Sequence, residues 1–227
     1  MSKENIIVED LGMTDYQIVW DYQKRLFQQV LDTKKTSKTP ENHLLFCEHP
    51  PVYTLGKNGD RQHLLINDAV LKQKNATFLA IDRGGDITFH GPGQLVAYPI
   101  FDLDSFPLSI KQFVFQLEEV IIRTVKHYGL TASRIEKATG VWLDAENPTK
   151  ARKIAAIGMR IHSKVSMHGF ALNVNTDLQY FSYIIPCGIR DKGVTSLQNE
   201  LGHEVEMREV KDLILKEFEV VFGQKIT

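Results

Sequence analysis

The sequence predicts a single α/β (α+β) domain over residues 1–227, in which a mixed β-sheet is flanked by helices. Three observations support this class. Three segments repeat apolar residues at helical spacing, and seven shorter runs between them have the composition of β-strands. The chain also has 227 residues, 43% of them hydrophobic, which is enough to build one full core. Alternating helical and strand segments of this kind are typical of a sheet covered by helices.

Two of the helical segments carry recognisable ends. The first is expected from Thr14, which is spaced from Gln17 as a capping box. Its apolar positions are Ile18, Val19, Tyr22, Leu26 and Val30. The second opens with a matching box at Ser109 and Gln112, and Gly129 stands where a glycine commonly ends a helix. All of these helices are expected to pack on the core and to carry no chemistry.

The β-like runs are short and bounded by turn residues. They are His43–Cys47, Val52–Leu55, Thr77–Ile81, Leu95–Ile100, Gly140–Leu143, Lys153–Ile161 and Met167–Asn175. The polar segment 144–148 favours a turn, which predicts a hairpin between the strands around Trp142 and Ile157. A third apolar helix follows near the C-terminus, from Val210 to Val221.

Composition limits the classes of function. The chain has 27 Lys and Arg against 28 Asp and Glu, a net charge of −1, which argues against a nucleic-acid partner held by a dominant cationic surface. The first ten residues lack the apolar core of a secretory signal, and no stretch approaches the roughly 20 apolar residues of a membrane span. Two cysteines do not make a disulfide framework. We therefore expect a soluble, cytoplasmic protein with neither nucleic-acid nor membrane partners.

The most unusual segment is residues 83–94, RGGDITFHGPGQ, which holds four glycines and one proline. Such glycines let backbone amides approach a ligand closely, although an ordinary long turn is an alternative. Two phosphate motifs are absent here. Val96 stands where a dinucleotide fingerprint needs its third glycine, and the P-loop-like spacing of residues 188–193 is followed by Val194 instead of lysine. We expect no nucleotide site and no ATP-driven activation.

The two cysteines differ in their surroundings. Cys47 lies in an apolar strand and is expected to be a small core residue, whereas Cys187 lies in a Pro-Cys-Gly turn. A thiol becomes a useful nucleophile when a cation or a helix N-terminus stabilises its thiolate. The candidate cations are Lys153, His90, His168 and Arg190. Spacing pairs none of them with Cys187, so a nucleophilic and a structural cysteine both remain open at this point. His162 and His168 with Cys187 lack the ligand spacing of a zinc site, so no metal is expected.

Three blocks of this sequence resemble the signature blocks of the octanoyltransferases of lipoate biosynthesis, also called lipoate–protein ligase B. They are Arg83–Ile100, Lys153–Arg160 and His168–Ile189, and they stand in the family's order. The resemblance implies a biotin/lipoate protein ligase-like fold. It also implies transfer of an octanoyl group from the phosphopantetheine thioester of acyl carrier protein to a specific lysine of lipoyl domains. The implied acceptors are the E2 subunits of 2-oxoacid dehydrogenases and the glycine cleavage H protein, and no cofactor is implied.

By the same resemblance, Cys187 is the acyl-thioester nucleophile and Lys153 is its partner. The positions that match the family's acyl-binding residues are Arg83, Gly84, Gly85, Asp86, Ile87, Thr88, Phe89, His90, Ala156, Ile157, Gly158, Gly169, Phe170 and Ala171. This chain departs from many relatives at residues 163–167, where an aromatic residue is expected before His168 and none occurs.

Several alternatives stay open. The proton of the incoming lysine amine goes either to Lys153 or to His90. Basic side chains that could dock an acidic carrier protein are Lys57, Arg61, Lys150 and Arg152, although a solvated surface charge is the favoured interpretation of each one. Other functions to weigh are an ATP-dependent lipoate or biotin ligase, a lipoyl-domain amidotransferase, and a silent acyl- or protein-binding module. The Pro-Cys-Gly turn and the block at Lys153 favour the transferase.

Overall fold

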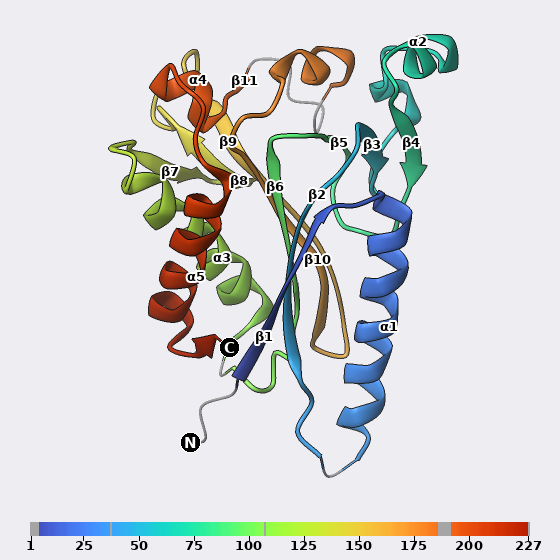
Figure 1. Ribbon diagram of the computed structural model, residues 1–227, viewed down its shortest axis with the longest axis vertical. Helices are drawn as coiled ribbons and strands as arrows, with labels where there is room; N and C mark the ends of the chain where they lie inside the picture. The colour runs from blue at the N-terminus through green and yellow to red at the C-terminus, as the bar shows by residue number, and fades with distance from the viewer. Residues whose placement is uncertain (1–4, 37, 107, 186–191, 227) are drawn as a thin grey trace.

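A mixed β-sheet with helices on both faces forms the body of the protein, as the computed structural model shows (Figure 1). The structure describes residues 5–36, 38–106, 108–185 and 192–226. Within these ranges the larger sheet has nine strands in the order β12-β1-β2-β6-β10-β9-β8-β7, with β11 paired to β9. They are β1 (Asn5–Met13), β2 (Asn42–Glu48), β6 (Gln94–Ile100), β7 (Ala132–Ile135), β8 (Ala138–Leu143), β9 (Arg152–His162), β10 (Val165–Asn173), β11 (Gly193–Val194) and β12 (Lys225–Ile226). The predicted fold class is confirmed.

A second, three-stranded sheet has the order β4-β3-β5. Its strands are β3 (Val52–Leu55), β4 (Thr77–Ala80) and β5 (Ile87–His90). The remaining elements are α1 (Tyr16–Lys34), η1 (Arg61–His63), α2 (Asp68–Gln73), α3 (Ile110–Lys126), η2 (Leu178–Tyr183), α4 (Leu197–Leu201) and α5 (Met207–Phe222).

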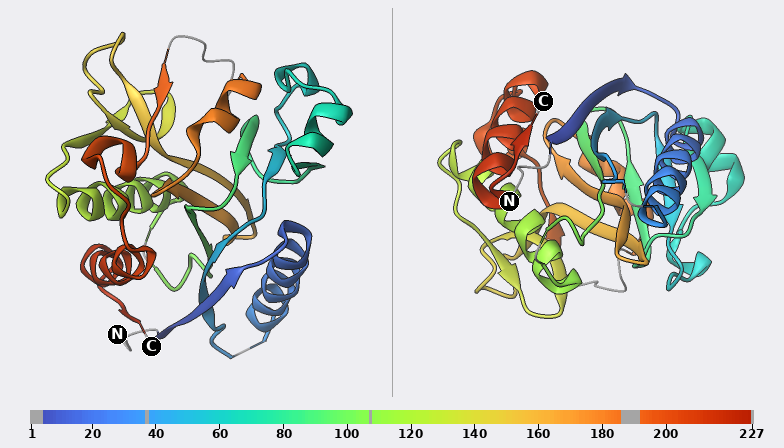
Figure 2. Two further views of the ribbon diagram at one scale, coloured as in Figure 1. Left: turned by 45° about the horizontal axis from the view of Figure 1, so that its top comes forward. Right: turned by 90° about the horizontal axis from the view of Figure 1, so that it is seen from below.

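The helices cover opposite faces of the larger sheet (Figures 1 and 2). Helix α1 packs on β6 and β10, where Val19 and Leu26 meet Val96 and Met167 in one apolar cluster. Helices α3 and α5 pack against each other on the other face, and their apolar side chains join the largest cluster of the core. The sheet is therefore buried on both sides, which explains why β6 and β10 read as nearly continuous apolar runs.

Helix α3 confirms the predicted ends. The Ser109 hydroxyl accepts from the backbone N–H of Gln112, whose side chain accepts in turn from the backbone N–H of Ser109. At the other end Gly129 has a left-handed φ of 75°. Its N–H donates to the carbonyl of Lys126, and the next N–H donates to that of Val125, which is the Schellman pattern. Helix α5 confirms the third predicted helix.

Helix α1 corrects two details of the first predicted helix. Its N-cap is Asp15, not Thr14, because the Asp15 carboxylate accepts from the first backbone N–H groups, while the Thr14 hydroxyl donates back to the carbonyl of Leu11. The buried face is also rotated. Ile18 is 64% exposed, whereas Gln23 is buried because its side chain accepts from the backbone N–H of His168.

All seven predicted strands are present within a residue or two of the expected bounds. The predicted hairpin is confirmed, since β8 and β9 pair antiparallel with Trp142 opposite Lys153. The glycine-rich segment 83–94 is not a plain loop, however: its residues 87–90 form β5, which pairs with β3. Strands β1, β7, β11 and β12 and helices α2 and α4 were not predicted.

Candidate active site

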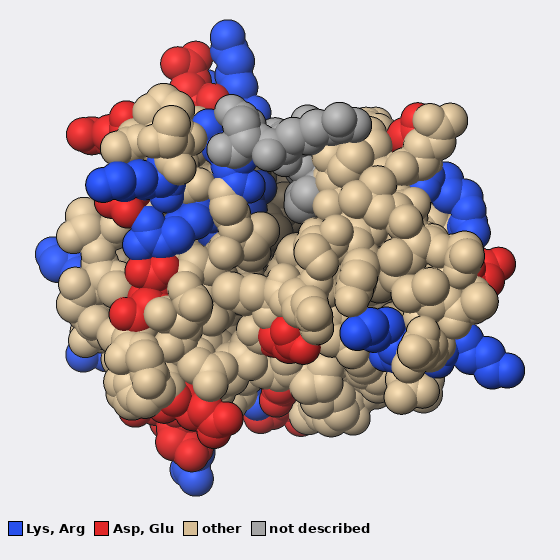
Figure 3. Space-filling view, turned by 90° about the horizontal axis from the view of Figure 1, so that it is seen from above, with Lys and Arg blue, Asp and Glu red and all other residues tan. Residues whose placement is uncertain are grey.

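A cavity of about 780 Å³ lies between the glycine-rich segment and the strands β9 and β10. That volume is within the range of small-molecule sites in proteins. The residues that line it are Tyr16, Arg83, Gly84, Gly85, Asp86, Ile87, Thr88, His90, Gln94, Val96, Tyr98, Ile110, Val114, Lys137, Ala138, Thr139, Lys153, Ala156, Ile157, Gly158, Met159, Ile161, His168, Gly169, Phe170, Ala171, Asn173, Phe181 and Val194. Figure 3, the view from above, shows a hollow on this face, with Lys and Arg side chains gathered on one side of it.

The three sequence blocks therefore meet at one cavity. Every acyl-binding position named from the resemblance lines it except Phe89, and Lys153 lines it as well. Phe89 packs instead inside the smaller sheet, with its ring 4.5 Å from that of Tyr180 and 5.3 Å from that of Tyr53. Cys187 lies outside the described residues.

Lys153 stands at the start of β9, beside residues that leave room for its long side chain. Its Nζ donates to the carbonyl of Thr139 at 3.1 Å and lies 4.7 Å from the ring centroid of Trp142. Gly140 has a φ of 128°, and a Cβ there would stand 3.2 Å from the Lys153 Cε. A carbonyl and an aromatic face both attract an ammonium, so these two contacts help to fix the Lys153 side chain on the wall of the cavity.

Glycines bring the glycine-rich segment against β9. The backbone N–H of Gly84 donates to the carbonyl of Met159 at 2.9 Å. Gly158 and Gly169 stand opposite each other on β9 and β10, and a Cβ on Gly158 would lie 3.1 Å from Arg83 Cδ. A Cβ on Gly169 would lie 2.1 Å from the carbonyl oxygen of Ala97, so glycine is required at that position, whereas a Cβ on Gly158 would only crowd Arg83.

Arg83 joins the glycine-rich segment to the smaller sheet. Its guanidinium donates to the carbonyl and the hydroxyl of Thr54 at 2.7 and 3.0 Å, and to the carbonyl of Gly84 at 2.9 Å. The residue is 7% exposed. Through these bonds the planar guanidinium fixes the path of the backbone at Arg83 and Gly84, which forms one wall of the cavity.

His90 occupies a buried position on the cavity wall. Its Nδ1 is 2.8 Å from Oε1 of Gln94, and its ring stacks on that of Tyr16. Burial lowers the pKa of His90 well below its usual value, and the nearby His49 and Arg83 lower it further. The ring is therefore neutral near pH 7.

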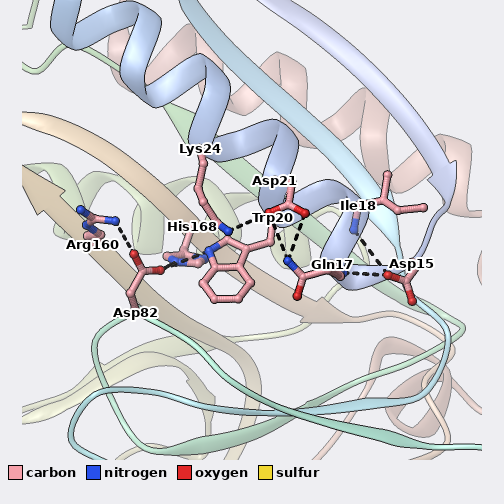
Figure 4. Close-up of polar contacts among 9 residues, drawn as sticks. All are labelled: Asp15, Gln17, Ile18, Trp20, Asp21, Lys24, Asp82, Arg160 and His168. Atoms are coloured by element: carbon pink, nitrogen blue, oxygen red, sulfur yellow. Dashed lines mark hydrogen bonds and ion pairs between the residues drawn. The ribbon is translucent and has the colours of Figure 1, made fainter.

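His168, which lines the cavity, forms a polar cluster with Asp82 (Figure 4). His168 Nε2 donates to the Asp82 carboxylate at 2.8 Å, Trp20 Nε1 donates to it at 3.2 Å, and Arg160 forms an ion pair with it. The hydrogen bond from His168 is the largest cause that lowers the pKa of Asp82. His168 holds a φ of 61°, a strained value for a residue with a Cβ, and the cluster keeps it there.

Sequence reasoning missed several lining residues. Gln94 and Asn173 fall inside the quoted blocks but were given no role. Asp82, the hydrogen-bond partner of the lining residue His168, stands directly before the first block and was also missed. Tyr16 and Tyr98 come from α1 and β6, which were interpreted as core elements. An amide side chain directly after a glycine-rich segment is a sequence signal that could have identified Gln94. Nothing local marks Tyr16, because its place depends on how α1 packs.

The proposed docking residues are not equivalent. Lys57 and Lys150 are exposed. Arg61 lies over the ring of Phe78, and Arg152 is held by Glu200 and Asp144 on either side. Arg152 is thus part of the scaffold that carries Lys153. Separately, none of the described helices has both the length and the apolar character needed to cross a bilayer.

The fold agrees with comparisons to known proteins. Residues 15–219 match the family model of the lipoyl protein ligase A/B catalytic domain. A bi-partite lipoate protein ligase from Thermoplasma acidophilum superposes with a TM-score of 0.73 over 100% of this chain and 86% of its own. Its sequence identity is 15%, so that likeness concerns the fold. The chain belongs to the lipoyl protein ligase A/B family.

Curated relatives show to which group of this family the chain is most similar in sequence. An octanoyltransferase from Cytophaga hutchinsonii is 50% identical over 97% of this chain and 94% of its own length. Another from Bacteroides fragilis is 52% identical over 93% of this chain and 95% of its own. The chain is thus an acyltransferase of the octanoyltransferase group, as the three sequence blocks predicted.

Proposed function

We propose that this protein transfers an octanoyl group from acyl carrier protein to a specific lysine of lipoyl domains, through a thioester on Cys187. One observation carries the proposal: the three separate sequence blocks line a single cavity, with Lys153 on its wall. The acceptors proposed are the E2 subunits of 2-oxoacid dehydrogenases and the glycine cleavage H protein. These partners place the reaction in the cytoplasm.

Two contacts fix the described residues that stand before and after Cys187 in the sequence. On one side of residues 186–191, the N–H of Ile185 donates to the carbonyl of His63 at 2.9 Å. On the other side, β11 pairs in parallel with β9, and Val194 stands opposite Lys153. Both flanks of the Pro-Cys-Gly turn are therefore tied to elements near the cavity. This supports a cysteine and a lysine that act together.

In the first half-reaction, the Cys187 thiolate attacks the thioester carbonyl of the octanoyl donor. A carbon–sulfur bond forms to Cys187, the bond to the pantetheine sulfur breaks, and the released thiolate takes a proton from the Lys153 ammonium. Lys153 supplies positive charge beside the cysteine, which favours the thiolate form. One thioester replaces another, so the proposal needs no nucleotide and no cofactor.

The glycine contacts support an acyl chain in the cavity. Gly84, Gly158 and Gly169 leave the walls without side chains where the glycine-rich segment meets β9 and β10. Ile157, Ala156 and Ala171 make the surroundings largely apolar, which suits a hydrocarbon chain. Burying such a chain is favourable by roughly 0.8 kcal/mol per CH₂ group.

The experiment is intact-protein mass spectrometry after brief mixing with octanoyl-loaded acyl carrier protein, without ATP. Wild type and Cys47→Ala should each gain one octanoyl group, and Cys187→Ser should gain none. Cys47 is the matched control because it is fully buried, and burial raises the pKa of its thiol. Lys153→Ala should acylate far more slowly than wild type.

Other outcomes would identify the alternatives. Activity that appears only with free octanoate and ATP would indicate a ligase. An adduct that forms only from an octanoylated lipoyl domain would indicate an amidotransferase. Normal acylation of Lys153→Ala would exclude the role of Lys153 in stabilising the thiolate.

A further inference from the structure

We propose that Tyr16 sets the longest acyl chain that the cavity accepts, because its ring closes the buried end of a floor that an octanoyl chain just spans. The inference rests on the proposed function above and deepens it, since it names a residue that selects the acyl group by its length. Tyr16 is the first residue of α1 and lies outside the three sequence blocks.

The lining of the cavity becomes more buried from β9 toward β6. Ile110, Lys137 and Thr139 are exposed, and Lys153, whose Nζ donates to the Thr139 carbonyl, stands on this open side. The lining residues of β9 are half-buried, whereas those of β10 and β6 are buried. Tyr16 is 2% exposed. In the proposed reaction the acyl chain therefore enters over β9, and its methyl end points toward β6 and α1.

The floor of this path is a row of small side chains across three strands. Ala156 on β9 pairs with Ala171 on β10, which pairs on its other side with Val96 on β6. All three residues line the cavity. Neighbouring strands are about 4.8 Å apart, so the row from Ala156 to Val96 is about 10 Å long. An extended eight-carbon chain spans roughly 9 Å, because its carbon–carbon bonds of about 1.5 Å follow a zigzag. An octanoyl chain laid across the sheet thus ends at Val96.

Two contacts place Tyr16 over the buried end of this row. Its hydroxyl shares a hydrogen bond with that of Tyr98, and its ring stacks on that of His90. His90 Nδ1 is 2.8 Å from Oε1 of Gln94. Gln94 and Tyr98 are the residues of β6 two positions before and after Val96, so they share its face of the sheet. Tyr16 is thus tied to both neighbours of Val96 on this face, and its ring stands where the row ends.

The Tyr16 ring is held firmly in this place. It lies 4.9 Å from the ring of His49, and it packs with Val52 and Ile81 in one buried cluster. His49 is itself fixed, because its Nδ1 donates to the carbonyl of Thr14 at 2.7 Å. A side chain packed on several sides yields little, so this wall does not retreat before a longer chain.

The path is also closed along the strands. Beyond Gly169 on β10, Met167 packs with Val19 and Leu26 beneath α1. Ile100 belongs to the same apolar cluster and lies beyond Tyr98 on β6. The space beneath α1 is thus filled by side chains, which leaves the ring of Tyr16 as the end of the path.

Such a wall should discriminate strongly between acyl groups. A dodecanoyl chain is roughly 5 Å longer than an octanoyl chain, which is more than the row at Val96 can accommodate. A pocket without room for one extra methylene group typically discriminates by about 10–200-fold. We expect the wild type to favour octanoyl over dodecanoyl by at least about 100-fold.

The test is a competition between two donors. The full chain is given equal amounts of octanoyl and dodecanoyl acyl carrier protein with excess lipoyl domain, and mass spectrometry measures the ratio of the two products. Tyr16→Leu removes the ring but keeps an apolar side chain, and it should lower the preference for octanoyl by at least about tenfold. Phe27→Leu is the matched control. Phe27 is also a buried aromatic residue of α1, but it does not line the cavity, so its variant should keep the wild-type product ratio.

A second variant tests the floor and does not depend on the folding of Tyr16→Leu. Ala171→Val places two methyl groups midway along the row from Ala156 to Val96. A butanoyl chain of roughly 4 Å ends before Ala171, whereas an octanoyl chain passes over it. Ala171→Val should therefore lower the use of octanoyl relative to butanoyl by at least about tenfold.

Three outcomes would overturn the inference and leave the proposed function intact. They are equal use of octanoyl and dodecanoyl by the wild type, a wild-type product ratio in Tyr16→Leu, and an equal loss of both donors in Ala171→Val. Failure of the wild type to transfer octanoyl to the lipoyl domain would overturn both the inference and the proposed function.

Discussion

Asp82 connects three elements of the cavity scaffold through one carboxylate, so Asp82→Asn should weaken three contacts at once. The carboxylate accepts from Trp20 on α1 and His168 on β10, and pairs with Arg160 on β9. Asparagine keeps one acceptor oxygen but loses the charge, and its NH₂ group is a donor that would face other donors. Asp82 directly precedes Arg83, so the change also loosens the glycine-rich wall of the cavity.

The magnitude follows from the burial of each contact. His168 is 1% exposed, and a hydrogen bond from such a group to a charged acceptor contributes about 1.5–3 kcal/mol. The Arg160 and Asp82 side chains are 33% and 25% exposed, which limits that pair to about 1 kcal/mol. We therefore expect Asp82→Asn to lower the free energy of unfolding by about 2–4 kcal/mol. For a chain of this size that corresponds to a melting temperature about 4–16 °C lower.

The assay is thermal unfolding followed by circular dichroism at pH 7.5, with Asp21→Asn as the matched control. Asp21 is also an aspartate paired with a basic side chain, Lys24, but it is 59% exposed on the surface of α1. Its replacement should leave the melting temperature close to that of wild type, because the pair is open to solvent. Equal melting temperatures for the two variants would refute the reasoning.

The cluster also has a pH signature. Because the folded pKa of Asp82 is depressed, its stabilising contribution is present above the unfolded pKa of about 3.9. It is lost as the pH falls further, through the folded pKa. The stability difference between wild type and Asp82→Asn should therefore shrink below about pH 4. A gap that stays constant from pH 7 to pH 3 would contradict the assigned charge.

Three further predictions follow from the same contacts. Gly169→Ala should lower the free energy of unfolding in urea by at least about 2 kcal/mol, because its Cβ would stand 2.1 Å from the carbonyl oxygen of Ala97. The control is Gly202→Ala, which has open space around it and should cost only about 1 kcal/mol because of its left-handed φ. Burial lowers the pKa of His49 to about 4, so wild type should lose roughly 3 kcal/mol between about pH 6.5 and pH 4, and His49→Gln should lose measurably less. Gly158→Val should reduce the steady-state rate of octanoyl transfer by at least about tenfold, and should reduce the rate with a shorter acyl donor by less. An equal reduction with both donors would show that the new side chain does not contact the acyl chain.

Features set by neighbouring residues could be predicted from the sequence. The ends of α3 depend on the capping box of Ser109 and Gln112 and on a left-handed residue at Gly129. Each of these contacts spans only a few residues. Cys47 was predicted to be buried because its immediate neighbours are apolar, and it is fully buried. Family membership was predictable for a similar reason, since the blocks are contiguous strings of residues.

Features that depend on distant partners could not be predicted in this way. The face that α1 buries includes Gln23, whose partner is the N–H of His168, 145 residues away. Strand β5 lies inside a glycine-rich segment and is a strand because it pairs with β3, with His90 opposite Val52. Ile87, Thr88 and Phe89 are good strand formers, but the glycines on either side of them indicated a loop. The polarity of Gln23 likewise indicated an exposed position, and only its distant hydrogen bond explains its burial.

The sequence by itself determined the fold class, the family and the residue types available for chemistry. The tertiary structure alone decided which of them meet. It brought His90, Lys153 and His168 to the wall of one cavity, although they are 63 and 15 residues apart in the sequence. The physical reason is the register of β6, β10 and β9: backbone pairing sets which side chains stand side by side, and sequence spacing carries no record of that pairing.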